Sequence, residues 1–386
     1  MRTMRYYCKS VSSTSLIVLV LICLGCNISS TPKLRALEWP KADRLFLKDP
    51  KWVGADDAFS IDLGNGRTLW LFADTFIDPS GQHSRQNATM IRNSVAIQKG
   101  YNPSQARINF FWRNNSKMNP SSFFKEQGDN WFWPGHGIRI DDILIVFLMT
   151  VRKTNTGLGF EVFGWETVLV ENPNESPEDW KIEWLKAPKN NLGIIVGSAS
   201  VLKSGEYVYA FGSRETVKSH PIYVARWKQQ DLQKKDLFSM QWWCGQGSGW
   251  LSHTDLKAKP IPIFDNGQTE LTIHYDNDTQ KYLSVQTDGF GPAVIALRTA
   301  TEFNGHWSGL QVIYKPPEYE KEDICIYAGK AHPQLEGADL ILTYATNSFV
   351  FAKLVSDTTI YYPRFVKVVR HEKNRNQADS ASPSKE

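Results

Sequence analysis

The chain has 386 residues, of which 41% are hydrophobic and 22% are charged. These proportions are those of a folded protein and exclude an intrinsically disordered chain. The formal net charge is +4, from 44 basic and 40 acidic residues, so no basic surface for nucleic acid is expected. The 14 Trp and 14 Tyr suit β-strands, and they also suit surfaces on which sugar rings stack.

The N-terminus is typical of an export signal. Three basic residues precede an apolar run, residues 16–24, that is too short to span a membrane as a helix. Gly25 directly before Cys26 resembles a bacterial lipobox, in which the cysteine is lipidated and becomes the new N-terminus. We therefore expect residues 1–26 to be a lipoprotein signal peptide. The mature protein is then exported to the cell envelope, periplasm or exterior, and contacts the membrane through its N-terminal lipid alone.

Five similar pieces follow a leader at residues 27–50. Each has an apolar inner strand, a short turn, a very apolar second strand and a third strand, and the pieces recur roughly every 50 to 70 residues. Small sheets repeated around a ring leave only short, protected edges. The pattern predicts an all-β fold, a five-bladed β-propeller over residues 51–370. A pair of β-sandwich domains is the alternative. The polar residues 371–386 predict a disordered tail.

Cysteines and short motifs give no sign of a cofactor or a metal. Beyond Cys26, Cys244 and Cys325 remain, and they could form one disulfide or stay as two buried thiols. The chain has no phosphate-binding glycine loop, no metalloprotease motif and no serine-hydrolase elbow. We expect neither a cofactor nor a metal ion.

Polar residues collect at one mouth of the expected central channel. In a propeller, the inner strands begin at the face to which the second strands return, so residues distant in sequence meet there. The inner-strand starts offer Asp56, Asp57, His136, Glu270 and His332, and the ends of the second strands offer Asp74, Arg214, Asp288 and Asn347. With Trp133 beside them, these groups are typical of a sugar site. Solvated polar residues at a wet channel mouth are the alternative.

A resemblance to a known group is carried by four stretches: GADDAFSIDLGNGRTLWLFADTF (54–76), FWPGHGI (132–138), KAHPQL (330–335) and YYPRFVKV (361–368). They resemble an uncharacterised group of exported bacterial five-bladed propellers, related to families with endo-D-arabinanase members. The first stretch is also similar to the first blade of arabinanase, β-xylosidase and invertase propellers. That similarity implies a catalytic role for Asp57, with Asp56 as the alternative register. Those families have a carboxylate where this chain has His136, so their mechanism does not transfer directly.

Together these features predict a glycoside hydrolase acting on a pentose- or furanose-containing polysaccharide, such as arabinan. Asp57 is expected as base or nucleophile and Glu270 as acid, with Asp74 or Asp288 tuning the pKa of Glu270. The residues expected to bind substrate are Trp133, His136, Arg214, Asp288, His332 and Asn347. Because blades one and four are not neighbours, the two carboxyl groups should leave room for water and give inversion. The alternative is a non-catalytic glycan-binding or surface-assembly lipoprotein.

Overall fold

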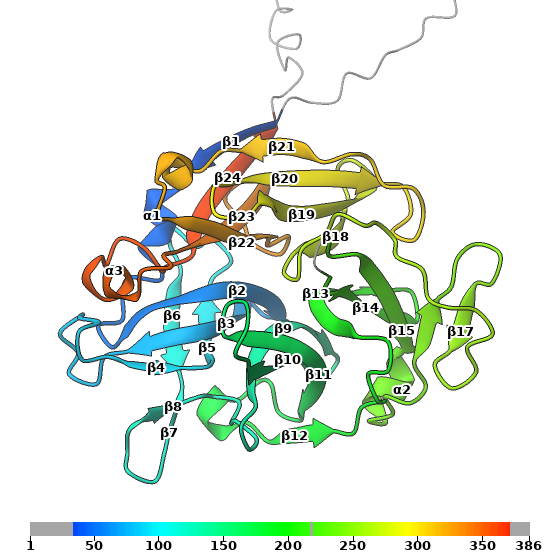
Figure 1. Ribbon diagram of the computed structural model, residues 1–386, viewed down its shortest axis with the longest axis horizontal. Helices are drawn as coiled ribbons and strands as arrows, with labels where there is room; N and C mark the ends of the chain where they lie inside the picture. Colours follow the sequence, from blue (N-terminus) through cyan, green and yellow to red (C-terminus); the bar gives the residue numbers. More distant parts are fainter. Residues whose placement is uncertain (1–33, 217–218, 371–386) are drawn as a thin grey trace, which may run out of the picture. The chain divides into compact units, whose positions relative to one another are not determined.

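The computed structural model describes residues 34–216 and 219–370 of the chain. Five antiparallel sheets are arranged around a common centre, and each turns one edge towards it (Figure 1). The fold is a five-bladed β-propeller, as predicted, and not a pair of sandwiches. The predicted signal peptide with Cys26 and the predicted tail lie outside the described residues, so both stay predictions. No helix of the described residues has the length and apolar character needed to cross a membrane.

The first two blades are built from consecutive strands. Blade one contains β2 (Trp52–Gly64), β3 (Arg67–Ile77), β5 (Ser94–Lys99) and β6 (Arg107–Phe111), with β4 (Thr89–Ile91) paired to β3. A small pair, β7 (Arg113–Asn114) and β8 (Pro120–Ser121), follows. Blade two contains β9 (Trp131–Ile140), β10 (Ile143–Lys153), β11 (Phe160–Val170) and β12 (Ile182–Leu185).

The next two blades repeat this plan. Blade three contains β13 (Ile194–Ser204), β14 (Tyr207–Arg214), β15 (Ile222–Lys228), β16 (Gln241–Trp243) and β17 (Trp250–Ser252). Blade four contains β18 (Thr272–Asp276), β19 (Lys281–Gly289), β20 (Ala293–Ala300) and β21 (Gln311–Tyr314). Three short helices, α1 (Pro40–Asp43), α2 (Gln229–Gln233) and α3 (Phe351–Ser356), lie in connections.

The last blade closes the ring with a strand from the start of the chain. Blade five contains β22 (Cys325–Ala331), β23 (Leu340–Asn347) and β24 (Arg364–Arg370), and β1 (Leu34–Glu38) pairs with β24 as the outermost strand (Figure 1). The sequence pattern predicts a propeller from residue 51 and places this segment in the leader. The structure extends the propeller to Leu34, because β1 covers the edge that β24 would otherwise expose.

Apolar side chains fill the spaces between neighbouring blades. One buried cluster joins blades one and two, and others join two to three, three to four, four to five and five to one. The largest buried side chains include Trp52, Trp70 and Trp227. Much of the aromatic content therefore serves the core. Cys244 and Cys325 lie in different blades as buried free thiols, so the disulfide alternative is wrong.

Candidate active site

An irregular stretch of β2 presents Asp56 and Asp57 to different surroundings. The register between β2 and β3 shifts between Ala55 and Asp57 and again between Asp57 and Phe59, so the pairing is irregular where the two acids stand. Asp57 and Ala58 have φ angles of 73° and 74°, in the left-handed region that residues with a Cβ rarely occupy. Such a conformation costs on the order of 1–3 kcal/mol per residue and is concentrated at functional sites. The strained backbone at Asp57 and Ala58 therefore marks this part of β2 as a candidate functional site.

The buried Lys330 of β22 joins three blades through its ammonium group. Its Nζ contacts the carboxylate of Asp57 in blade one and lies 3.1 Å from Glu270 Oε2 in blade four. The ring of Phe59 packs against the same nitrogen at 4.3 Å. Burial opposes the charge on Lys330, but the charges of Asp57 and Glu270 raise its pKa above the ordinary value. A buried ammonium requires this kind of pairing.

This ion-pair arrangement corrects two expectations. Asp57 is 1% exposed and held by Lys330, so it does not face a substrate, whereas the Glu270 side chain remains 20% exposed. The Lys330 ammonium lies between these two carboxyl groups, where a water molecule was expected. Asp57 is therefore a structural partner of Lys330, and the half-buried Asp56, the alternative register, is the candidate that remains.

Asp56 is a carboxyl group with one oxygen bound and one free. Tyr327 donates its hydroxyl proton to Asp56 Oδ2 at 2.8 Å, and Asn347 Nδ2 donates to the Tyr327 hydroxyl at 3.2 Å. Within the described part of the chain, the buried Oδ1 of Asp56 has no hydrogen-bond partner. Burial and the negative charges of Asp74 and Glu270 raise the pKa of Asp56 well above its usual range.

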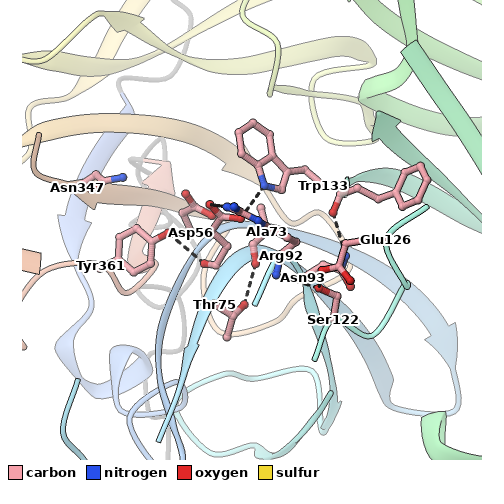
Figure 2. A network of polar contacts seen from close by, with 12 residues as sticks. Asp56, Ala73, Thr75, Arg92, Asn93, Ser122, Glu126, Trp133, Asn347 and Tyr361 are labelled. Carbon is pink, nitrogen blue, oxygen red and sulfur yellow. Dashed lines mark hydrogen bonds and ion pairs between the residues drawn. The ribbon is translucent and has the colours of Figure 1, made fainter. Parts of the chain in front are cut away.

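Asp74 stands beside Asp56 within β3, which continues to Ile77 and does not end at Asp74 as expected. It accepts hydrogen bonds from Trp133 Nε1 at 2.8 Å and from Arg92 Nη1 at 3.1 Å. Tyr361 donates its hydroxyl to the backbone oxygen of Asp74 at 3.1 Å. Figure 2 shows Trp133, Arg92 and Tyr361 gathered around Asp56. Burial raises the pKa of Asp74, and the Arg92 charge opposes that rise.

The two predicted histidines bind other parts of the protein. His332 follows the end of β22, and its ring nitrogens contact Ser60 Oγ at 2.6 Å and Thr343 Oγ1 at 2.8 Å. The backbone N–H of Val201 donates to His136 Nδ1 at 2.7 Å, and His136 Nε2 lies 3.0 Å from the oxygen of Ser60. Both rings have their polar atoms occupied, so neither is placed to hold a sugar hydroxyl. They connect blades instead.

Two further predicted residues lie apart from the carboxyl groups. The Arg214 guanidinium packs over the ring of Tyr223 at 5.3 Å, and Asp288 is exposed at the end of β19. Among the described residues, no hydrogen bond or ion pair joins either of them to Asp56, Asp74 or Glu270. In the same part of the chain, no group of three or more His, Cys, Asp and Glu is arranged to hold a metal ion.

The match to a family model decides the family. The model, described as Domain of unknown function (DUF5005), aligns with residues 41–372. The chain belongs to this family. A comparison with curated proteins finds no match.

This DUF5005 protein is similar to several solved structures, one of them with a TM-score above 0.5. A putative hydrolase from Bacteroides ovatus ATCC 8483 is 16% identical with a TM-score of 0.66, and the alignment covers 88% of this chain and 92% of that one. A thermostable family-43 glycoside hydrolase is 14% identical with a TM-score of 0.45, covering 86% and 95%. The catalytic domain of the GH62 α-L-arabinofuranosidase from Coprinopsis cinerea is 8% identical with a TM-score of 0.46, covering 88% and 97%.

Sequence reasoning missed four residues of the DUF5005 site: Tyr327, Lys330, Arg92 and Tyr361. It took His332 as the start of the inner strand of blade five, whereas β22 ends at Ala331. Tyr327 and Lys330 lie in β22, before His332, and were therefore not considered as site residues. A lysine within the apolar stretch CIYAGKA was a usable signal, because a buried ammonium needs carboxylates opposite it. No comparable signal marked Arg92 or Tyr361.

Proposed function

We propose that the protein is a glycoside hydrolase in which Asp56 and Glu270 act on a sugar bound at the channel mouth. The observation that carries the proposal is Asp56, whose buried Oδ1 has no hydrogen-bond partner within residues 34–216 and 219–370, and whose pKa is raised by burial and by the charges of Asp74 and Glu270. Hydrolysis of a glycosidic bond needs a protonated acid on one side of the sugar and a charged carboxylate on the other.

The surroundings of the two groups suggest a division of roles. Asp56 holds its proton to a higher pH than an ordinary carboxyl and would donate it to the leaving glycosidic oxygen. Glu270 forms an ion pair with the Lys330 ammonium at 3.1 Å and would take a proton from the attacking water. The bond from the anomeric carbon to the leaving oxygen breaks as the bond to water forms. Asp56 and Glu270 come from blades one and four, and we propose that they act with inversion.

The substrate class rests on sequence resemblance. The stretch 54–76 resembles the first blade of propellers that act on arabinan and xylo-oligosaccharides, so a polysaccharide containing pentose or furanose units is the substrate we propose. Screening plant, algal and mycobacterial polysaccharides would identify the glycan. Proton NMR of the first product would show its anomeric configuration, and retention would contradict the proposed inversion.

The roles of Asp56 and Glu270 are tested by substitution. Asp56→Asn and Glu270→Gln should each lower kcat/KM at least ~100-fold, because each removes one acid–base group. Asp142→Asn is the matched control, because this exposed carboxylate lies in the turn between β9 and β10, at the far ends of these strands. Near-normal activity in Asp56→Asn or Glu270→Gln, measured on folded protein, would contradict the acid–base role of that residue.

A glycan-binding function without catalysis is the second candidate. The observation that favours it is the ion pairing of Lys330 with both Asp57 and Glu270, which leaves fewer free carboxylates than a hydrolase uses. Such a protein would bind polysaccharides in the same screen without releasing a reducing end. In that case Glu270→Gln would alter binding and have no activity to abolish.

A further inference from the structure

A cluster of exposed aromatic rings lies at the channel-mouth ends of blades four and five. Phe290, Phe349 and Phe351 are 75%, 65% and 59% exposed, and we call these three residues the aromatic platform. The rings of Phe290 and Phe349 lie 5.9 Å apart, and the ring of Phe351 lies 6.3 Å from that of Phe76 in blade one. Exposed apolar side chains that gather in this way mark binding surfaces.

The backbone holds these rings outward by specific contacts. Phe290 stands in the turn between β19 and β20, after Gly289, whose φ is 118°. A Cβ on Gly289 would lie 2.7 Å from the oxygen of Pro292, so the turn requires glycine. The backbone N–H of Val350 donates to Ser348 Oγ at 3.1 Å, which orders the segment before α3. The rings are therefore presented by an ordered surface.

The aromatic platform is continuous with the candidate active site. It extends from blade four across blade five towards blade one, the three blades that supply Glu270, Lys330 and Asp56. The backbone N–H of Ile326 donates to the oxygen of Gly291 at 2.9 Å, which ties the Phe290 turn to β22. Asn347, two residues before Phe349, donates to the Tyr327 hydroxyl that binds Asp56. A chain leaving the carboxyl groups in this direction would meet these rings.

We propose that the aromatic platform binds the part of a neutral polysaccharide chain that extends beyond the reacting sugar. The C–H faces of sugar rings pack on aromatic rings, and residues 348–352 and 289–293 carry no charged side chain. A neutral chain matches this surface better than an anionic one. The inference rests on the proposed function in taking the substrate to be a polysaccharide.

The test measures polysaccharide binding and hydrolysis separately. The double variant Phe290→Ala/Phe349→Ala should bind linear arabinan or neutral xylan at least about tenfold more weakly in calorimetry, a loss of about 1.4 kcal/mol. Its kcat/KM on a small aryl pentoside should stay within about twofold of wild type. Phe238→Ala, an exposed phenylalanine of blade three, is the matched control and should bind like wild type. Glu270→Gln should retain the polysaccharide affinity that the platform provides, even if the variant abolishes hydrolysis.

Several results would overturn the proposal. Unchanged polysaccharide affinity in the double variant is one, and failure of wild type to bind any neutral polysaccharide of the panel is another. If the double variant instead loses binding to phosphatidylcholine vesicles while keeping polysaccharide affinity, the platform binds lipid.

Other results distinguish this proposal from the proposed function. Loss of aryl pentoside hydrolysis in Asp56→Asn but not in the double variant supports the active site and the platform as separate surfaces. Absence of hydrolysis in wild type, with platform-dependent binding intact, contradicts the proposed function alone.

Discussion

At the scale of single residues, two adjacent aspartates have different surroundings, and the backbone of the second is strained. The left-handed φ of Asp57 turns its side chain to the buried Lys330, while the buried Oδ1 of Asp56 has no hydrogen-bond partner among the described residues. A regular strand would also point neighbouring side chains to opposite faces, but it would not need this strained conformation.

The buried pairing of Asp57 predicts a loss of stability when its charge is removed. Asp57→Asn should lower the free energy of unfolding by roughly 3 kcal/mol, because Lys330 loses one of two carboxylate partners in a buried site. Urea denaturation at neutral pH measures this change. Asp56→Asn, which leaves Lys330 paired, should lose less than half as much. Equal losses in the two variants would contradict the separate roles.

Tyr327 predicts a shift in the pH dependence of activity. Its hydrogen bond lowers the pKa of Asp56, in opposition to burial and to the nearby carboxylates. Tyr327→Phe removes this bond, so the alkaline limb of kcat/KM that reports the Asp56 proton should move to higher pH. Tyr275→Phe, on an exposed tyrosine of blade four, should leave the limb in place. A limb that stays fixed, or moves to lower pH, in Tyr327→Phe would show that Asp56 is not the titrating acid.

At the scale of elements, local patterns predicted the blades and missed the contacts between distant segments. Alternating apolar runs with tight turns define each blade in one stretch of sequence, so all five were found. The pairing of β1 with β24 joins opposite ends of the chain, and nothing in the five residues of β1 indicates that partner. Asp74 and Trp133 were found because strand ends meet at one face. The burial of the Asp57 side chain depends on a backbone distortion that the pattern of residue types does not predict.

Arg85 shows how a buried side chain fixes the connection around α3. Its guanidinium donates to the backbone oxygens of Val53, at 2.5 Å, and Ile360, at 2.7 Å, and packs on the ring of Tyr362. These contacts hold β2, next to Asp56, against the segment that presents Tyr361. Among the residues that the structure describes, no carboxylate pairs with Arg85, and backbone carbonyls accept its hydrogen bonds instead.

The Arg85 contacts predict a local effect of substitution. Arg85→Met should cost about 3 kcal/mol of stability, because it leaves buried carbonyl groups unpaired. Amide hydrogen exchange should become faster in residues 350–362. Arg113→Met is the matched control, since Arg113 also donates to backbone oxygens and packs on an aromatic ring, but at a half-exposed position. Similar exchange in wild type and Arg85→Met would refute the positioning role.

At the scale of the whole molecule, polar contacts near the channel complement the apolar packing between blades. Lys330 joins blades one, four and five, and His136 joins blades one, two and three through Ser60 and Val201. Together they connect every blade of the ring. Because Val201 N–H donates to Nδ1 of His136, the ring is neutral with its proton on Nε2, donated to the oxygen of Ser60.

This contact makes stability depend on pH through His136. Burial lowers its pKa from 6.5 to about 4, so between these values the unfolded chain takes up a proton that the folded protein does not. The contribution of His136 to stability is complete above pH 6.5 and is lost progressively as the pH falls towards 4, by on the order of 3 kcal/mol.

His136→Gln should be less stable than wild type at pH 7, and the difference should shrink as the pH falls to 4.5. Urea denaturation across this range measures that difference, and the other buried groups cancel because both proteins contain them. His306→Gln, on an exposed histidine, should show the same pH dependence of the free energy of unfolding as wild type. If the difference between wild type and His136→Gln is instead constant with pH, His136 is protonated equally in both states, and the neutral hydrogen-bonded ring cannot be the link between the three blades.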